Sequence, residues 1–487
     1  MSDVVRTTSG DVSGTTDEGS HVFLGVPFAA PPFADRRFAA PARAEPWDGV
    51  RACVRFGPTA PQRDPGITII PEPVERGEDC LNLNITTPEL GDAKLPVFVY
   101  IHGGGFVSGC NRSPWYRGTR FARDGVVVVS VGYRLGIEGF LDLAGAPANR
   151  GVLDWIAALE WVQENIAAFG GDPSAITIGG QSAGAAACLV LAANPHADGL
   201  FSRVVAMSGT SDTRMPRERL TELGEKMAAQ LGVRATRDDF ARFTPDELID
   251  AHAAVGTNPF SADAIGSAFD PRSAALKPFV DGDVVPEHPF RVIADGRTSD
   301  IDLIASATAN EVNGMIHLNM DEESAQAALS AMGLVGDKLD RYLEHTGAEN
   351  PVGAMAQAAT DRAFRGNLAQ LLADRAATGG RTFGYEYKRP STLPGVGAAH
   401  CLDIPFVFDN LDAERVEDGL IGPNPPQPLA DLMHERIVRF IKTGDAGWPE
   451  YEAERRTMQV FDDESRAVER YLDVELELFG RARAKPA

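Results

Sequence analysis

Two runs of apolar residues constrain the fold of this chain more than any other feature. They are LPVFVYI at 95–101 and VVVVSVGY at 126–133, and neither alternates between polar and apolar residues as a half-exposed strand does. Continuous, largely β-branched runs of this kind are typical of parallel strands that helices cover on both faces. The sequence therefore predicts an α/β fold, in which these two runs lie in the middle of the sheet.

The segments that follow alternate between helix and strand. Apolar residues recur at helical spacing from 152 to 169 and stop at two glycines, which predicts an amphipathic helix. AITIG at 175–179 resembles another buried strand, and the small and apolar residues of 183–193 predict a helix. Strands are also predicted at 301–307 and 382–387, each after a helical region.

The two ends of the chain extend this pattern without dividing it. Before about residue 90, glycines and prolines are frequent and indicate short antiparallel strands and turns. No repeat and no Ser- or Pro-rich linker separates the halves. We therefore expect one domain over 1–487, with a central, mostly parallel mixed sheet and helical insertions over the site at about 209–300 and 312–380.

A candidate nucleophile lies between the predicted strand at 175–179 and the helix after it. Gly180-Gln181-Ser182-Ala183-Gly184 matches the pattern GxSxG, in which glycines permit a strained turn that exposes a serine hydroxyl. The pattern alone is weak, but a strand before it and a helix after it are the context that the chemistry needs. Ser182 is the predicted nucleophile of a serine hydrolase.

A second glycine-rich turn, HGGGF at 102–106, directly follows the predicted strand 95–101. Consecutive glycines leave backbone N–H groups free to approach a substrate oxygen, so this turn is the candidate oxyanion hole. The predicted donors are the N–H groups of Gly104, Gly105 and Ala183.

The serine needs a histidine base, and in α/β-hydrolases the acid lies between the serine and the histidine in the chain. His400 lies in a small-residue loop after a predicted strand, where catalytic groups are often placed. His345 and His434 lie in charged helical segments, which favours exposed or capping roles. His252, His288 and His317 come too early in the chain. His400 is therefore the predicted base.

The acid should follow a strand between Ser182 and His400. The predicted strand 301–307 delivers Glu311 four residues beyond its end, which favours this carboxylate. Asp281 and Asp283 lie in a polar turn and stay open as alternatives.

The chain resembles the type B carboxylesterase family, which includes bacterial p-nitrobenzyl esterases and, more distantly, cholinesterases. The motifs that carry this resemblance cover most of the chain: GVPFAAPP (25–32), FGPTAPQ (56–62), EDCLNLNI (78–85), HGGGF, YRLGIEGFL (133–141), NIAAFGGDPSAITIGGQSAG (165–184), the loop GAAHCLDIPFVF ending at Phe408, and TGDAGWPEY (443–451). The resemblance implies the α/β-hydrolase fold, the triad of Ser182, Glu311 and His400, and the same oxyanion donors.

The chain departs from the family pattern at two places. The family usually has Asp-Glu-Gly around the acid, whereas this chain has Asn310-Glu311-Val312. Many secreted members have a disulfide at Cys80, whose partner position is Ala60 here. The resemblance also implies a supporting role for Ser208 next to the acid and the histidine.

Composition limits the partners. The formal net charge of −23 disfavours nucleic acid and anionic membrane surfaces, and favours neutral or cationic small-molecule esters. The N-terminus resembles no signal peptide, no run is long enough to span a bilayer, and the five cysteines are scattered. We expect a cytoplasmic enzyme that needs no metal or organic cofactor. The oligomeric state does not follow from the sequence.

Ester hydrolysis through an acyl-enzyme on Ser182 is the predicted activity. A carbamate or amide hydrolase would use the same residues, and a non-catalytic binding protein of this fold is the alternative of another class. A preference for choline esters is not expected. By resemblance, the main aromatic wall of a choline site falls near Ile70, in a stretch without Trp, Tyr or Phe, and a second falls at Gly314.

Overall fold

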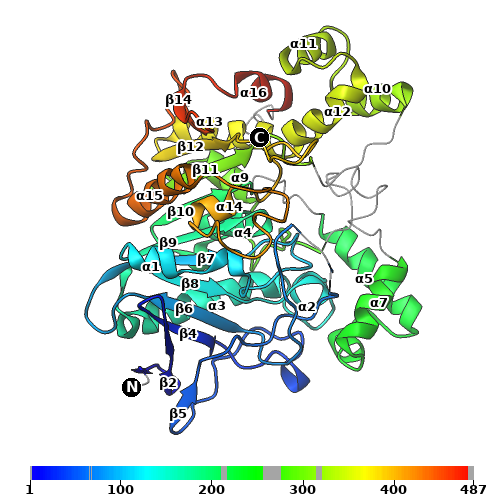
Figure 1. The fold of residues 1–487 in the computed structure, drawn as a ribbon. Coiled ribbons are helices and arrows are strands. Elements are labelled where there is room, and N and C mark those ends of the chain that lie inside the picture. Colours follow the sequence, from blue (N-terminus) through cyan, green and yellow to red (C-terminus); the bar gives the residue numbers. More distant parts are fainter. Residues whose placement is uncertain are drawn as a thin grey trace.

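A computed structural model describes residues 3–64, 66, 69–209, 216–255, 276–313 and 321–480. In these ranges, eleven strands form one large sheet, and three more form a small sheet near the N-terminus (Figure 1). The large sheet has the order β14-β13-β12-β11-β10-β9-β7-β8-β6-β4-β3. Its strands are β3 (Thr15–Asp17), β4 (Ser20–Pro27), β6 (Asn82–Thr87), β7 (Leu95–Ile101), β8 (Val127–Val131), β9 (Gly171–Gln181), β10 (Arg203–Met207), β11 (Asp302–Thr308), β12 (Thr382–Tyr387), β13 (Met458–Phe461) and β14 (Arg466–Val468).

The centre of the sheet is parallel and its edges are antiparallel. All neighbouring pairs from β8 to β13 are parallel, with Val99 of β7 opposite Val129 of β8 and Ile178 of β9. Strands β6, β4 and β3 on one edge, and β14 on the other, are antiparallel to their neighbours. The predicted mostly parallel mixed sheet is thereby confirmed.

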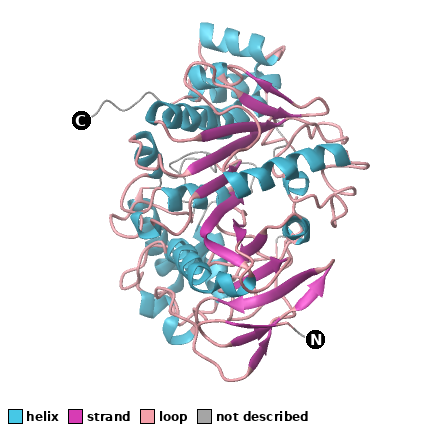
Figure 2. Ribbon diagram, turned by 90° about the vertical axis from the view of Figure 1, so that its left-hand side faces the viewer, coloured by secondary structure: helices cyan, strands magenta, loops and turns pink. Residues whose placement is uncertain are grey.

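Strand β7 shows why its sequence has no polar face. Val99 and Ile101 belong to a core shared with α3 (Arg150–Asn165), α4 (Ala183–Ala192) and α13 (Gly366–Thr378). Phe98 and Tyr100 belong to the opposite core, shared with α1 (Thr119–Arg123) and α15 (Gln427–Thr443). Because successive side chains alternate between the two faces, both sets must be apolar. Figure 2 shows helices on both sides of the sheet.

The predicted helices lie close to their expected ranges. The segment 152–169 forms α3 and a short 3-10 helix, which Gly170 ends in the left-handed conformation at φ 83°. The remaining helices include α2 (Gly136–Phe140), α5 (Arg217–Leu231), α6 (Arg237–Phe240), α7 (Pro245–Val255), α9 (Pro289–Ala294), α10 (Glu322–Ala331), α11 (Asp337–Thr346), α12 (Pro351–Thr360), α14 (Ile404–Val407) and α16 (Asp473–Phe479).

Two helical groups extend from the sheet at the predicted insertions. Helices α5 to α7 form one group, and α10 to α12 form the other; both lie on the right of the view in Figure 1. Residues 210–215, 256–275 and 314–320 of these insertions, including His317 and Gly314, lie outside the described residues. None of the described helices is long and apolar enough to cross a membrane.

The N-terminal sheet differs from the prediction in one pairing. Strands β1 (Val4–Arg6) and β2 (Asp11–Ser13) are antiparallel, as expected, but β5 (Val50–Ala52) runs parallel to β2. The long connection between β2 and β5 gives the chain room to return in the same direction, which a tight turn cannot do.

Candidate active site

Ser182 lies at the sharp turn between β9 and α4. Its backbone has φ 58° and ψ −122°, a conformation that non-glycine residues adopt rarely and mostly at functional sites. Gly180 and Gly184 are required here. A Cβ added to Gly180 would lie 2.5 Å from the Gly184 carbonyl carbon, and one added to Gly184 would lie 2.0 Å from the Ile101 oxygen. The Ser182 N–H donates to the Met207 oxygen at 2.9 Å. The turn thus lifts the serine to the carboxyl edge of the parallel strands.

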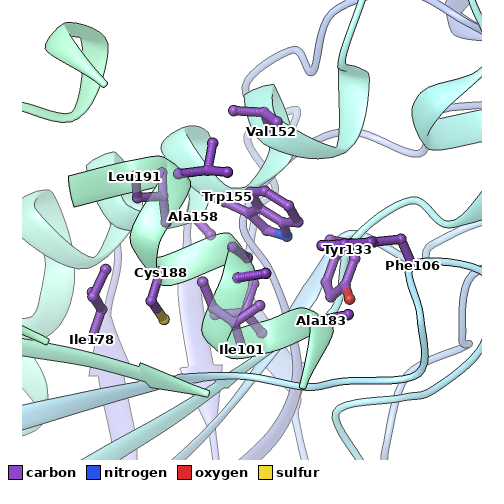
Figure 3. Close-up of a cluster of buried hydrophobic side chains, with 14 of the residues drawn as sticks. Ile101, Phe106, Tyr133, Val152, Trp155, Ala158, Ile178, Ala183, Cys188 and Leu191 are labelled. Carbon is purple, nitrogen blue, oxygen red and sulfur yellow. The ribbon is translucent and has the colours of Figure 1, made fainter. Parts of the chain in front are cut away.

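The turn packs on a cluster of apolar side chains. Ala183, Ile101, Tyr133, Phe106 and Trp155 lie around the start of α4 in Figure 3. All are buried in one core. Their packing holds the first turn of α4 against the end of β7.

The glycine turn after β7 lies directly beside the serine. A Cβ on Gly103 would stand 3.2 Å from the Ser182 Cβ, and Gly104 and Gly105 have φ of 102° and 62°. Among the described residues, none accepts a hydrogen bond from the backbone N–H of Gly104, Gly105 or Ala183. These three groups, which the sequence predicted as oxyanion donors, are therefore available to a substrate oxygen.

Glu311 and His400 form a close pair. Glu311 is fully buried, and its Oε2 lies 2.5 Å from His400 Nδ1, while its Oε1 accepts from the Thr308 N–H at 2.7 Å. The His400 N–H donates to the Glu311 carbonyl oxygen at 3.1 Å. This arrangement fixes the tautomer with a proton on Nδ1 and leaves a lone pair on Nε2.

Asn310 connects the loop of the acid to the loop of the histidine. Its N–H donates to the Ala398 oxygen, and its side-chain Oδ1 accepts from the Ala398 N–H, both at 3.0 Å. Its Nδ2 donates to Gln357 of α12 at 3.0 Å. The asparagine that departs from the family pattern therefore joins two loops that are distant in the chain.

Burial and the neighbouring groups shift the pKa of His400 in opposite directions. Burial alone would lower the pKa of the imidazole, but Cys401 and Glu311 beside it raise this pKa well above its usual value. Burial also raises the pKa of the Cys401 thiol. A neutral thiol carries no charge, so we ascribe the raised pKa of His400 to Glu311.

The structure does not join Ser182 to His400. Within the described ranges, the Ser182 hydroxyl makes no hydrogen bond, and His400 Nε2 lies 3.1 Å from Gln181 Nε2. The hydroxyl of Ser208, buried at the end of β10, has no hydrogen-bond partner among the described residues either. Glu311 and His400 are thus paired, and among the described residues neither of them hydrogen-bonds to the Ser182 hydroxyl.

The alternative residues lie elsewhere. Asp281 accepts hydrogen bonds from Asn149 and from the N–H groups of Asp283 and Val285, as a carboxylate in a tight turn does. His345 bonds to Glu475 at 3.1 Å. His434 was expected to be exposed or to cap a helix. It is buried against Phe121, and its Nδ1 lies 2.8 Å from the oxygen of Val407, the last residue of α14, which is a capping contact.

Some residues of the site were not predicted from the sequence. Gln181 and Cys401 contact His400 and each other, and their positions next to Ser182 and His400 in the sequence were a signal that both could lie in the site. Phe364, from a π-helical turn (Asp361–Arg365), packs its ring 5.2 Å from that of His400. No local pattern marks this contact. Within the described ranges, no cluster of His, Cys, Asp or Glu could hold a metal ion.

Comparisons with known proteins agree over nearly the whole chain. The model of the carboxylesterase family matches residues 1–478. A phenmedipham hydrolase from Pseudarthrobacter oxydans is 34% identical, over 96% of this chain and 97% of the relative. A para-nitrobenzyl esterase from Bacillus subtilis is 33% identical, over 95% of each chain. A solved PNB esterase structure, 30% identical, superposes with a TM-score of 0.82 over 98% of this chain and 100% of that chain.

Proposed function

This chain belongs to the carboxylesterase family and is a hydrolase of carboxylic esters, and from this premise we propose that Ser182, His400 and Glu311 carry out the reaction. Ser182 Oγ attacks the ester carbonyl carbon while His400 Nε2 takes the hydroxyl proton. The N–H groups of Gly104, Gly105 and Ala183 stabilise the oxyanion that forms. Glu311 holds the imidazole and stabilises its cation.

The tetrahedral intermediate then collapses. The carbon–oxygen bond to the alcohol breaks, and the alcohol leaves with the proton that His400 received. Water attacks the acyl-enzyme with the same histidine as base, and the carboxylic acid is released. Every step uses residues of this chain, and none requires a metal or an organic cofactor.

One observation carries the proposal: the buried Glu311 Oε2 lies 2.5 Å from His400 Nδ1, at the edge of the sheet where Ser182 stands in its strained turn. This pair leaves the Nε2 lone pair as the basic atom. The hydrogen bond from Ser182 to Nε2 would form when the substrate closes the site, since catalytic hydrogen bonds often tighten only in the complex. Ser208 would support the acid and the base from the end of β10.

Covalent labelling tests this assignment. An organophosphonate ester should react with one equivalent of protein and should modify Ser182, as mass spectrometry of the digested protein would locate. The reaction needs the activated hydroxyl and the oxyanion donors, so a heat-denatured sample should not be labelled. Modification of any other serine would overturn the assignment, and absence of labelling would favour a non-catalytic binding protein.

We further propose one domain over 1–487, whose insertions at about 209–300 and 312–380 shape the substrate gorge. The single large sheet, from β3 to β14, supports one domain. Rates on p-nitrophenyl esters of graded chain length would define the acyl preference. Phenmedipham should be included because of the similar hydrolase, and a carbamate and an amide because the same residues can attack those carbonyls.

The remaining proposals concern partners and location. The charge of −23 favours neutral or cationic substrates over nucleic acid. The five cysteines are buried and free, which supports a reducing compartment and hence the cytoplasm.

We expect no preference for choline esters. An aromatic ring over a quaternary ammonium contributes about 0.5 to 2 kcal/mol, but Ile70, at the expected main wall, is a buried aliphatic residue. Butyrylcholine and an uncharged butyrate ester of similar leaving-group ability should differ less than about tenfold in kcat/KM, and any advantage from long-range attraction should vanish at high salt. A kcat/KM that is tenfold or more higher for butyrylcholine, and stays so at high salt, would contradict this prediction.

A further inference from the structure

Two buried side chains with no assigned role lie against His400. Gln181, 1% exposed, precedes the nucleophile, and Cys401, 6% exposed, follows the base. Gln181 Nε2 lies 3.1 Å from His400 Nε2, and the Cys401 thiol donates to Gln181 Oε1 at 3.2 Å. Cys401 has φ 72°, a left-handed backbone that is uncommon for a non-glycine residue. The amide therefore bridges the thiol and the imidazole.

Donor and acceptor chemistry decides which end of the amide faces the imidazole. His400 Nδ1 bears a proton because it faces the Glu311 carboxylate, so Nε2 of the neutral ring can only accept. The amide N–H₂ group is the end that can donate to it. The other end, Oε1, needs a donor, and the Cys401 thiol supplies one. Burial raises the pKa of this thiol, so it keeps its proton near neutral pH.

We propose that Cys401 fixes the orientation of the Gln181 amide, so that its N–H faces His400 Nε2 and stabilises the neutral imidazole of the free enzyme, until the Ser182 hydroxyl takes its place at Nε2 with substrate bound. Both are positioning residues for the base. This inference rests on the proposed function of His400, and it adds a role for two residues outside the triad.

This orientation of the Gln181 amide favours the neutral imidazole, whereas Glu311 favours the imidazolium. A donor facing Nε2 bonds the neutral ring but cannot bond the imidazolium, whose Nε2 also carries a proton. If the amide turned around, Oε1 would accept from the imidazolium and stabilise the charged form. Cys401 prevents this rotation, since it would leave the thiol without its acceptor. The fixed amide thus keeps the base unprotonated at lower pH than Glu311 alone would allow.

The other titratable groups around His400 do not change in this comparison. They are Glu311 and Asp403, the latter a buried carboxyl whose pKa burial and the charge of Glu311 raise to about 6. The ring of Phe364 covers another side of the imidazole. All three stay in place when Cys401 is replaced. Because Cys401 also contacts His400 directly, its substitution is compared with the same substitution in a Gln181→Met background, where only a direct effect of the thiol can act.

The test is the pH dependence of kcat/KM in the full-length protein, with p-nitrophenyl butyrate as substrate. In Cys401→Ala, the acid limb should move to higher pH by about half to one unit, the size expected when one hydrogen bond to the imidazole is exchanged. Cys401→Ser keeps a donor and should return the limb toward its original position. Cys53→Ala, which removes a buried thiol elsewhere, should leave the profile unchanged.

A second set of variants keeps the test decisive if Cys401→Ala does not fold. Gln181→Met removes the amide and should itself move the acid limb of kcat/KM to higher pH, because the neutral imidazole loses its hydrogen-bond donor. Adding Cys401→Ala or Cys401→Ser to Gln181→Met should cause no further shift, since no amide remains to be oriented.

The inference would be overturned if the acid limb of kcat/KM stayed at its original pH in both Cys401→Ala and Gln181→Met. Equal shifts of this limb in Cys401→Ala and Cys401→Ser would also overturn it. Phosphonate labelling of Ser182 separates this failure from failure of the proposed function. If the unsubstituted protein is labelled at Ser182 but the limbs do not move, the triad stands and only the role of Gln181 and Cys401 is wrong.

Discussion

Ser182→Ala is expected to lower kcat for ester hydrolysis by roughly a million-fold. The residues of a serine hydrolase triad act as a unit, so loss of the nucleophile removes the acyl-enzyme route altogether. The substitution should not disturb the fold, because within the described ranges the Ser182 hydroxyl makes no hydrogen bond that the fold depends on. Steady-state rates with p-nitrophenyl butyrate and a thermal melt check both parts.

Ser174→Ala provides the matched control. Ser174 lies exposed on the same strand, β9, and its hydroxyl donates to the nearby Asp172 at 2.7 Å. This variant should retain its activity within about twofold. If Ser182→Ala keeps more than a few per cent of activity, then another residue is the nucleophile.

Glu311→Gln should lower kcat by about a thousand- to ten-thousand-fold, the range seen when a triad acid is replaced by its amide. The carboxylate accepts the Nδ1 proton of His400 at 2.5 Å and stabilises the imidazolium of the transition state. An amide at this position is neutral and can present an N–H to Nδ1, which favours the wrong tautomer. Some activity should remain, because Ser182 and the oxyanion donors are intact.

The same substitution should move the pH profile in a defined direction. The neutral imidazole is the active form, so activity is lost as the pH falls through the pKa of His400. In the unsubstituted protein, Glu311 holds this pKa above its usual value, and the acid limb of kcat/KM should lie above about pH 6.5. Removing the charge should lower the pKa and move the acid limb to lower pH, even as the rate falls.

Asp281→Asn and Asp283→Asn serve as controls for the acid. Both carboxylates lie in a turn that does not reach His400, so each variant should stay within about threefold of the original rate. Near-normal turnover in Glu311→Gln together with a large loss in Asp281→Asn would transfer the role of the acid to Asp281.

Local sequence patterns predicted the scaffold of the site with little error. The apolar run at 95–101 coincides with β7, and the segment 382–387 coincides with β12. The turn that holds Ser182 followed from two glycines between a strand and a helix, because backbone sterics act within a few residues. The order of serine, acid and base along the chain then pointed to Glu311 and His400, whose roles stay predictions.

The bonds that tie distant segments together had no such signal. Arg134, next to the end of β8, forms a buried ion pair with Asp154 of α3, with nitrogen–oxygen distances of 2.8 and 2.6 Å. Arg365 bonds Asp361 of its own helical turn and also two buried carboxylates that are distant in the chain, Glu386 and Glu475. The sequence predicts that each of these charged side chains is exposed, because charged side chains are seldom buried without a partner. Only the fold supplies the partner.

The sequence by itself determined most of the helices and strands and the parallel sheet, because backbone sterics and hydrophobic periodicity are local properties. It also indicated the candidate catalytic residues, with the family resemblance favouring Glu311 among the carboxylates. The tertiary structure alone decided how the base is held. The Gln181 amide between Cys401 and His400, and the pairing of Asn310 with Ala398, join residues that lie about 90 to 220 positions apart. Hydrogen bonds depend on distance and direction in space, and no periodicity along the chain encodes them.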